Sequence, residues 1–168
     1  KITNEILLGF IHCPYKAYRK SKSESGEISD YEKTLYELKY SRKLLFSETL
    51  SFAKTSIRNQ SAGINFTFND GIILDPKFSN SNTEIILDGI EFISKNKAIP
   101  ILLTSFEKIT QADKLFVSLQ ASLIQTEFNL KIDSCKVIHG KNLQQTQFKL
   151  PSFTKSIKKS VKPRMMSI

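Results

Sequence analysis

The stretch EIILDGIEFISKNKAIPILL, residues 84–103, decides the fold class of this chain. It contains two apolar segments, 84–93 and 98–103, which are rich in isoleucine and leucine. Both segments have the length of a strand rather than that of a helix, and isoleucine is common in strands. We therefore expect two extended segments in the core of a sheet.

A long helix is expected on the N-terminal side of this stretch, over residues 30–52. Ser29 or Asp30 is its expected N-cap, because short polar side chains accept hydrogen bonds from the first free backbone N–H groups of a helix. Helical spacing predicts that its apolar stripe consists of Leu35, Leu38, Leu45 and Phe52.

Further helices and strands on both sides complete the expected fold. They are a helix over 2–20 that Thr3 caps and Pro14 interrupts, a hairpin with strands near 64–68 and 72–74 and its turn at 69–71, a helix over 110–128 and a strand over 135–138. Helices and strands mixed in this order indicate an α/β domain with a mixed central sheet flanked by helices.

Positive charge is concentrated at the end of the chain. Lys and Arg number 25 against 16 Asp and Glu, a net charge of +9, and residues 141–168 carry seven cations and no acidic residue. We expect a domain over residues 1–140, followed by a strand and a flexible tail. Cations of this tail can neutralise nucleic-acid phosphates and release counterions: Lys155, Lys158, Lys159, Lys162 and Arg164. Charge alone also permits a solvated tail or contact with an anionic membrane.

Composition and motifs exclude several classes of protein. No run of about 20 apolar residues predicts a transmembrane helix, and Asn4 and Glu5 interrupt any signal-peptide core. Cys13 and Cys135 lie too far apart in sequence for a metal-binding motif, and two free thiols indicate a reducing, cytoplasmic environment. The six glycines form neither a phosphate-binding loop nor a nucleophile elbow.

Asp88 is the acidic residue of greatest chemical interest, because its neighbours in the sequence are apolar. If residues 84–93 form one strand, Asp88 shares a face with Ile86 and Ile90, and its carboxylate needs a hydrogen bond or a cation there. If Asp88 and Gly89 form a turn between two short strands, the carboxylate is a turn residue. The residues themselves leave both interpretations open.

The five tyrosines of the chain all fall in the two N-terminal helical regions, at positions 15, 18, 31, 36 and 40. Aromatic rings on such helices either stack on nucleic-acid bases or pack against the core and neighbouring helices, and packing is the commoner use. We therefore expect these rings in helix packing.

Three parts of the chain resemble a known family. They are ITNEILLGFIHCPYKAYRKSKSESGEISDYEKTLYEL at 2–38, the ILDG strand at 86–89 followed by AIPILLTSFEKITQADKL at 98–115, and KVIHGKN at 136–142. In this order and spacing they resemble the RecB-like nucleases of the PD-(D/E)XK superfamily, which are related to the iron–sulfur exonucleases of CRISPR adaptation. The resemblance covers nearly the whole chain and implies a restriction-endonuclease-like core over 1–140.

This resemblance implies roles for individual residues. Asp88 matches the first acidic residue of the superfamily, which holds Mg²⁺ or Mn²⁺ for phosphodiester hydrolysis. The second motif, Glu or Gln followed by x-Lys, belongs on the next strand, where this chain has Leu102 and Thr104. Leucine cannot ligate a metal and threonine carries no charge, so the motif is degenerate. Glu37 takes the place of an auxiliary acid, and Glu107-Lys108 is the nearest pair that could substitute for the motif.

Cys13 has a second implied role. Iron–sulfur members of the family use one cysteine of the first helix and three near the C-terminus to hold a 4Fe-4S cluster. This chain has no such C-terminal trio, so the resemblance implies a cluster at Cys13 only in a longer form of the chain. Without a cluster, Cys13 is expected to be a buried thiol on an apolar helix face, and Cys135 to be a core residue.

Two functions follow as expectations. The first is a cytoplasmic DNA-binding domain of this nuclease fold, whose tail grips the phosphate backbone without reading sequence and in which Asp88 is the candidate metal ligand. The alternative is a non-catalytic nucleic-acid-binding or assembly module, which recruits DNA, a helicase or a nuclease within a larger protein. RNA in place of DNA is compatible with both.

Overall fold

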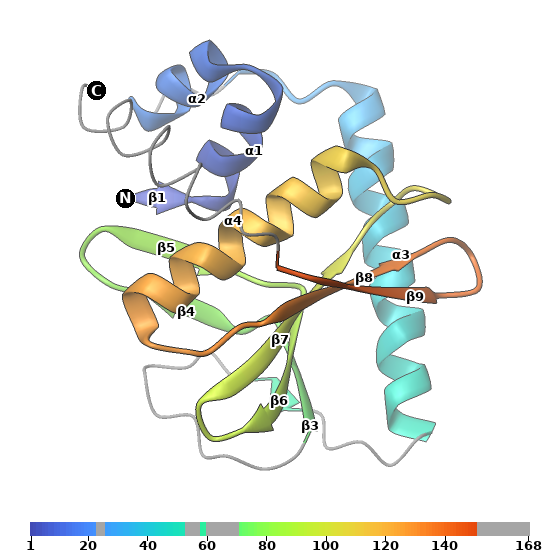
Figure 1. Ribbon diagram of the computed structural model, residues 1–168. Coiled ribbons are helices and arrows are strands. Elements are labelled where there is room, and N and C mark those ends of the chain that lie inside the picture. The colour runs from blue at the N-terminus through green and yellow to red at the C-terminus, as the bar shows by residue number, and fades with distance from the viewer. Residues whose placement is uncertain (23–25, 53–57, 60–70, 151–168) are drawn as a thin grey trace.

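The computed structural model of the chain describes residues 1–22, 26–52, 58–59 and 71–150 (Figure 1). Its helices are α1 (Asn4–His12), α2 (Pro14–Ser21), α3 (Asp30–Phe52) and α4 (Gln111–Phe128). Its strands are β1 (Ile2–Thr3), β2 (Arg58–Asn59), β3 (Gly71–Leu74), β4 (Lys77–Ser79), β5 (Thr83–Ile86), β6 (Gly89–Ser94), β7 (Lys97–Leu103), β8 (Ser134–His139) and β9 (Gln144–Lys149). The first strand and most of the turn of the expected hairpin, residues 64–70, and the tail from Lys155 to Arg164 lie outside these residues, whereas the second strand, expected at 72–74, is confirmed as β3.

A six-stranded mixed sheet forms the centre of the fold, in the order β2-β3-β6-β7-β8-β9. β6 pairs antiparallel with both β3 and β7, whereas β7 and β8 are parallel. A parallel pair needs a crossover connection, and α4 provides it. A smaller sheet has the order β1-β5-β4. The expected α/β class, a mixed sheet flanked by helices, is confirmed.

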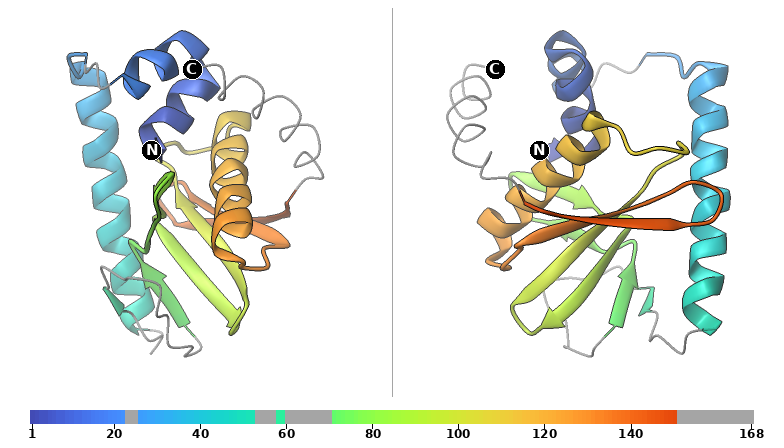
Figure 2. Two further views of the ribbon diagram at one scale, coloured as in Figure 1. Left: turned by 90° about the vertical axis from the view of Figure 1, so that its left-hand side faces the viewer. Right: turned by 45° about the vertical axis from the view of Figure 1, so that its right-hand side comes forward.

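Helices cover both faces of the six-stranded sheet (Figure 2). Side chains alternate along β7, so that Leu102 packs into the core shared with α4 while Ile101 and Leu103 pack into a second core. Phe46 and Leu50 of α3 complete this second core. The domain therefore has three layers, with β7 buried between α3 and α4.

α3 has the bounds expected from the sequence but buries a different stripe. Ser29 caps it, since Ser29 Oγ accepts a hydrogen bond from the Glu32 N–H at 3.2 Å and Glu32 Oε2 accepts one from the Ser29 N–H at 3.0 Å. Phe46 is buried, whereas Leu38 and Leu45, expected in the stripe, are exposed. Neighbouring residues of a helix point about 100° apart. The narrow contact with the sheet therefore holds Phe46 and leaves Leu45 outside.

The caps and the breaker predicted for the other helices are confirmed. Thr110 caps α4, because Thr110 Oγ1 accepts from the Asp113 N–H at 3.1 Å and Asp113 Oδ2 accepts from the Thr110 N–H at 2.8 Å. Pro14 ends the first helical piece and occupies the first turn of α2, and Thr3 caps α1. These helix ends are therefore determined by local sequence.

α1 and α2 approach each other closely at Gly9 and Ala17. A Cβ atom built on Gly9 would lie 3.0 Å from both the N and the Cα of Ala17, and Ala17 itself is buried. This distance is tighter than nine in ten real Cβ contacts, and the neighbouring atoms belong to the backbone, so a helix would have to shift by a few tenths of an ångström. The missing side chain of Gly9 is therefore what allows α2 to lie against α1.

Gly9→Ala is expected to lower the free energy of unfolding by roughly 1–3 kcal/mol, because the added methyl group pushes two backbones apart. This loss outweighs the gain in helix propensity of up to about 1 kcal/mol. Gly26→Ala is the matched control, since a Cβ atom there meets nothing within 4 Å. Urea unfolding measures both variants, and a change of equal size in the two would contradict the close contact.

Candidate functional site

A cleft of about 270 Å³ lies at the carboxyl end of β7. Residues 102–106, which end β7 and follow it, line the cleft together with side chains of all four helices. The resemblance places its second catalytic motif at Leu102 and Thr104, which both line this cleft. The cleft is therefore the place to look for the implied chemistry.

Cations and acids balance each other in the cleft. Its charged side chains are Glu5, Lys16, Lys20, Glu32, Lys39 and Asp113. The Lys20 Nζ lies 3.1 Å from Glu5 Oε2, and the Lys16 Nζ lies 3.6 Å from Glu32 Oε1. Hydrogen bonds from Ser29, together with the charge of Lys16, hold the pKa of the Glu32 carboxyl below its ordinary value. The cleft is thus lined by ion pairs and is not a cationic groove.

Asp88 lies where the chain passes from one sheet to the other. β5 belongs to the three-stranded sheet and β6 to the six-stranded one, so residues 84–93 form neither a single strand nor a hairpin. The single strand is therefore wrong, whereas the two short strands with Asp88 in a bend between them are confirmed, except that they do not pair as a hairpin. The bend arises because Ile85 and Leu87, on one side of it, and Ile90, on the other, are all fully buried in one core.

The carboxylate of Asp88 is engaged at both oxygens. Its Oδ1 lies 2.9 Å from the Nζ of Lys39, and its Oδ2 accepts a hydrogen bond from the Leu103 N–H at 2.8 Å. The side chain is 15% exposed. Lys39, which also lines the cleft, therefore supplies within the chain the positive charge that a partly buried carboxylate needs.

The other two positions of the implied motif bring no ligand to Asp88. Leu102 and Thr104 are both buried, and the Thr104 Oγ1 accepts a hydrogen bond from the Phe106 N–H at 3.3 Å. Mg²⁺ and Mn²⁺ need several oxygen ligands, of which carboxylates are the usual protein contribution. In the described part of the chain, no three His, Cys, Asp or Glu side chains are grouped to hold a metal ion. The residues at this position do not fit a divalent metal centre.

Neither Glu107 nor Glu37 joins Asp88. The Glu107 Oε1 lies 2.6 Å from Nη2 of Arg42, whose Nη1 also donates to the carbonyl oxygens of Thr104 and Phe106 at 2.7 and 2.8 Å. Glu107 thus helps to fasten α3 to the loop after β7. Glu37 is exposed, and its separation of two residues from Lys39 places it about 200° away around α3.

A partly buried amide network holds α1 beside the cleft. Asn4 Nδ2 donates to the carbonyl oxygen of Ile86 at 2.6 Å, and Gln120 Nε2 donates to Asn4 Oδ1 at 3.1 Å. Gln120 is buried in α4. The network links α1, β5 and α4, so the position of α1 over the end of the sheet is fixed by hydrogen bonds as well as by packing.

The two cysteines have opposite environments. Cys13 is exposed at the junction of α1 and α2, which corrects the expected buried thiol. Cys13 has an extended backbone and lies between the end of α1 and the start of α2, so it is not part of a helix face. Cys135 is buried in the core as expected, and burial raises the pKa of its thiol to about 12. The two described cysteines therefore do not form a common ligand set.

The tyrosines are on the surface, contrary to the expectation that they pack between helices. All five rings are exposed: Tyr15, Tyr18, Tyr31, Tyr36 and Tyr40. The buried aromatic side chains are phenylalanines, among them Phe46, Phe78 and Phe116. The sequence did not predict that the tyrosines are exposed while phenylalanines are buried, and it did not predict that Lys39 pairs with Asp88. Lys39 could have been found as a charged residue one helical turn from Leu35 and two from Phe46, on the inner side of α3.

Comparison with known proteins adds no family. The chain matches no protein-family model and no curated protein. None of the helices in the described part of the chain combines the length and the apolar character that crossing a bilayer requires. The side chains described above are therefore the basis for inferring a function.

Lys39→Met is expected to lower the free energy of unfolding by roughly 1–3 kcal/mol, because it leaves the Asp88 carboxylate without its cation. Adding Asp88→Asn should restore part of this loss, since the amide needs no counter-charge. Lys33→Met is the matched control, because Lys33 lies on the same helix and pairs with a fully exposed Asp30. Urea unfolding of these variants, and of Asp88→Asn alone, gives the coupling free energy between Lys39 and Asp88. Equal losses in Lys39→Met and Lys33→Met would contradict the special role of Lys39.

Thiol labelling should separate the two cysteines. In the folded protein a maleimide or aromatic disulfide reagent is expected to modify one thiol, Cys13, and in denaturant to modify two. The buried Cys135 stays protonated below about pH 12 and is inaccessible, so raising the pH from 7 to 9 should not expose it. Mass spectrometry identifies the modified residue, and native labelling of Cys135 would contradict the core position.

Proposed function

We propose that this chain is a DNA-binding domain on a restriction-endonuclease-like fold and that it lacks a metal-dependent nuclease centre of its own. The observation that carries the proposal is the ion pair between Asp88 and Lys39. A carboxylate that holds a catalytic cation must offer it free oxygen lone pairs, whereas Asp88 gives one oxygen to an ammonium group and the other to the Leu103 N–H.

The order of elements around Asp88 supports the nuclease-like fold. The acidic residue immediately precedes β6, the antiparallel neighbour β7 carries Leu102, and the helix that follows is α4. This is the order that the resemblance implies: an acid on the central hairpin, a second motif on the next strand and a helix after it. The chain has this order of elements but not the residues of the second motif. This combination supports a domain with the scaffold of these nucleases and without their catalytic residues.

Net charge supports nucleic acid as the partner. The chain has a formal net charge of +9, and seven of its cations lie in residues 141–168. Because the charges of the cleft are balanced, the binding of phosphates falls to this basic segment. Contacts of this kind hold the backbone of DNA without reading its sequence.

A non-catalytic domain of this kind would serve a larger DNA-processing machinery. Hydrolysis would then come from a nuclease partner or from another domain, and strand separation from a helicase. DNA is proposed in preference to RNA because of the resemblance to DNA nucleases, and equal affinity for both would change that preference.

Neutralising the basic segment should weaken binding to duplex DNA and flatten its salt dependence. Five substitutions to glutamine are proposed together: Lys155, Lys158, Lys159, Lys162 and Arg164. Each lost phosphate contact lowers the slope of log K against log salt by about 0.9, so the slope should fall by up to roughly 4–5. Fluorescence anisotropy at several KCl concentrations measures this. Lys77→Gln/Lys97→Gln, which removes two ion-paired surface lysines, is the control.

Calorimetric titration of Mn²⁺ tests the absence of a metal centre. The protein is expected to give no stoichiometric binding, and DNA should remain intact on incubation with Mn²⁺. Stoichiometric binding that Asp88→Ala abolishes, accompanied by DNA cleavage, would overturn the non-catalytic proposal in favour of a metal-dependent nuclease. Failure of the unaltered protein to bind DNA at low salt would overturn DNA binding itself.

A further inference from the structure

Two exposed aromatic rings lie on one face of α2. Tyr15 is 66% exposed and Tyr18 is 41% exposed. They are three residues apart, and Arg19 and Lys22 follow at the fourth and seventh positions after Tyr15. Residues at i, i+3, i+4 and i+7 share one side of a helix. We call these four residues the aromatic–basic face: Tyr15, Tyr18, Arg19 and Lys22.

The orientation of this face is set by the opposite side of the helix. Ala17 is the buried residue of α2 and packs on Gly9 of α1. Because Ala17 is two residues from Tyr15, it points about 200° away from it around the helix. Residues at the spacing i, i+3, i+4 and i+7 face the core in most amphipathic helices. In α2 the residues at this spacing face solvent.

Charge on α2 is of one sign. Residues 14–22 contain four cations and no acid. Lys16 and Lys20 point towards the cleft, where they pair with Glu32 and Glu5. Lys22 belongs to the aromatic–basic face, and its Nζ lies 5.7 Å from the centroid of the Tyr18 ring. Aromatic rings interleaved with cations are typical of surfaces that bind single-stranded nucleic acid.

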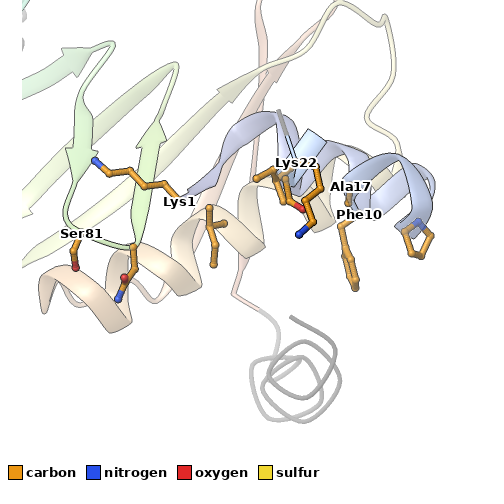
Figure 3. Close-up of a pocket in the computed structure, with 10 residues that line it drawn as sticks. Lys1, Phe10, Ala17, Lys22 and Ser81 are labelled. Atoms are coloured by element: carbon orange, nitrogen blue, oxygen red, sulfur yellow. The ribbon is translucent and has the colours of Figure 1, made fainter. Parts of the chain in front are cut away.

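A hollow of about 580 Å³ adjoins the aromatic–basic face (Figure 3). Lys22 lines it together with Phe10 and Ala17, and Lys1 and Ser81 lie at its other end. The lining is mostly apolar with lysines at the margin. A single strand of nucleic acid that crosses α2 would therefore meet, beside Lys22, a recess with an apolar wall. An apolar wall suits the flat face of a base.

We propose that the aromatic–basic face of α2 binds unpaired bases of single-stranded nucleic acid. The tyrosine rings stack on successive bases, and the cations of the face neutralise the phosphates between them. Stacking needs a base whose face is free, and in a duplex both faces of each base are covered by its neighbours. This inference rests on the proposed nucleic-acid binding and adds to it a preference for unpaired strands. The charge of the face favours a polyanion over an apolar protein partner.

Anisotropy with a single-stranded DNA oligonucleotide, an RNA of the same sequence and the corresponding DNA duplex tests the proposal. Tyr15→Ala/Tyr18→Ala is expected to weaken single-strand binding at least roughly tenfold. Duplex affinity should change by less than about twofold, because the basic segment provides it. Tyr31→Ala/Tyr40→Ala removes two similarly exposed rings from α3 and is the matched control. Thermal unfolding of each variant confirms that the fold is kept.

Tyrosine emission provides a second readout, because the chain contains no tryptophan. Bases that stack on Tyr15 and Tyr18 quench their emission. Tyr15→Phe/Tyr18→Phe keeps two aromatic rings, so it should bind the single strand as the unaltered protein does, while most of the quenching disappears. Quenching that is the same in this variant would overturn stacking at α2.

The outcomes separate the inference from the proposed function. If the unaltered protein binds neither single strands nor duplex, both fail. If it binds them and the alanine variant binds single strands equally well, the inference alone is overturned and an acidic protein partner becomes the better occupant of the face. If the alanine variant loses single-strand and duplex binding equally, α2 acts without stacking and the inference is likewise overturned.

Discussion

β7 is buried from Ala98 to Leu103, and its side chains are apolar on both faces. A strand of this kind is stable only when both faces are covered. This requirement places α3 on one side of the sheet and α4 on the other, and α4 in turn connects β7 to its parallel neighbour β8. The cleft lies where the buried strand ends, so its position follows from the constraint on β7.

Polar contacts near the cleft hold α3, which makes few apolar contacts with the sheet. The described part of α3 buries Phe46 and Leu50, which lie in its second half. Its middle is fastened by Lys39 to Asp88 and by Arg42 to the chain after β7. The Asp88 carboxylate is therefore part of the scaffold, and its removal would loosen the attachment of α3.

Local rules explain why much of the fold could be predicted. The starts of α3 and α4 follow from caps within three residues of each helix start, and β7 and β8 from short apolar runs. What could not be predicted depends on distant parts of the chain. The bend at Asp88 arises because residues on both sides of it are buried in the same core. Lys39 pairs with Asp88, which lies 49 positions away in the sequence. The exposure of Tyr15 and Tyr18 arises because α2 uses Ala17, a small residue, for its contact with α1.

The contact of Gly9 with Ala17 also has an entropic consequence for any ligand of α2. Because Gly9 and Ala17 bring the two backbones into close contact, the backbone of α2 is held on α1 before a ligand arrives. A tyrosine side chain has two χ angles, so little conformational entropy remains to be lost on binding. Affinity at such a surface would come from preorganisation as much as from contact area. A change at Gly9, which is not part of the aromatic–basic face, would then speed the dissociation of a ligand from α2.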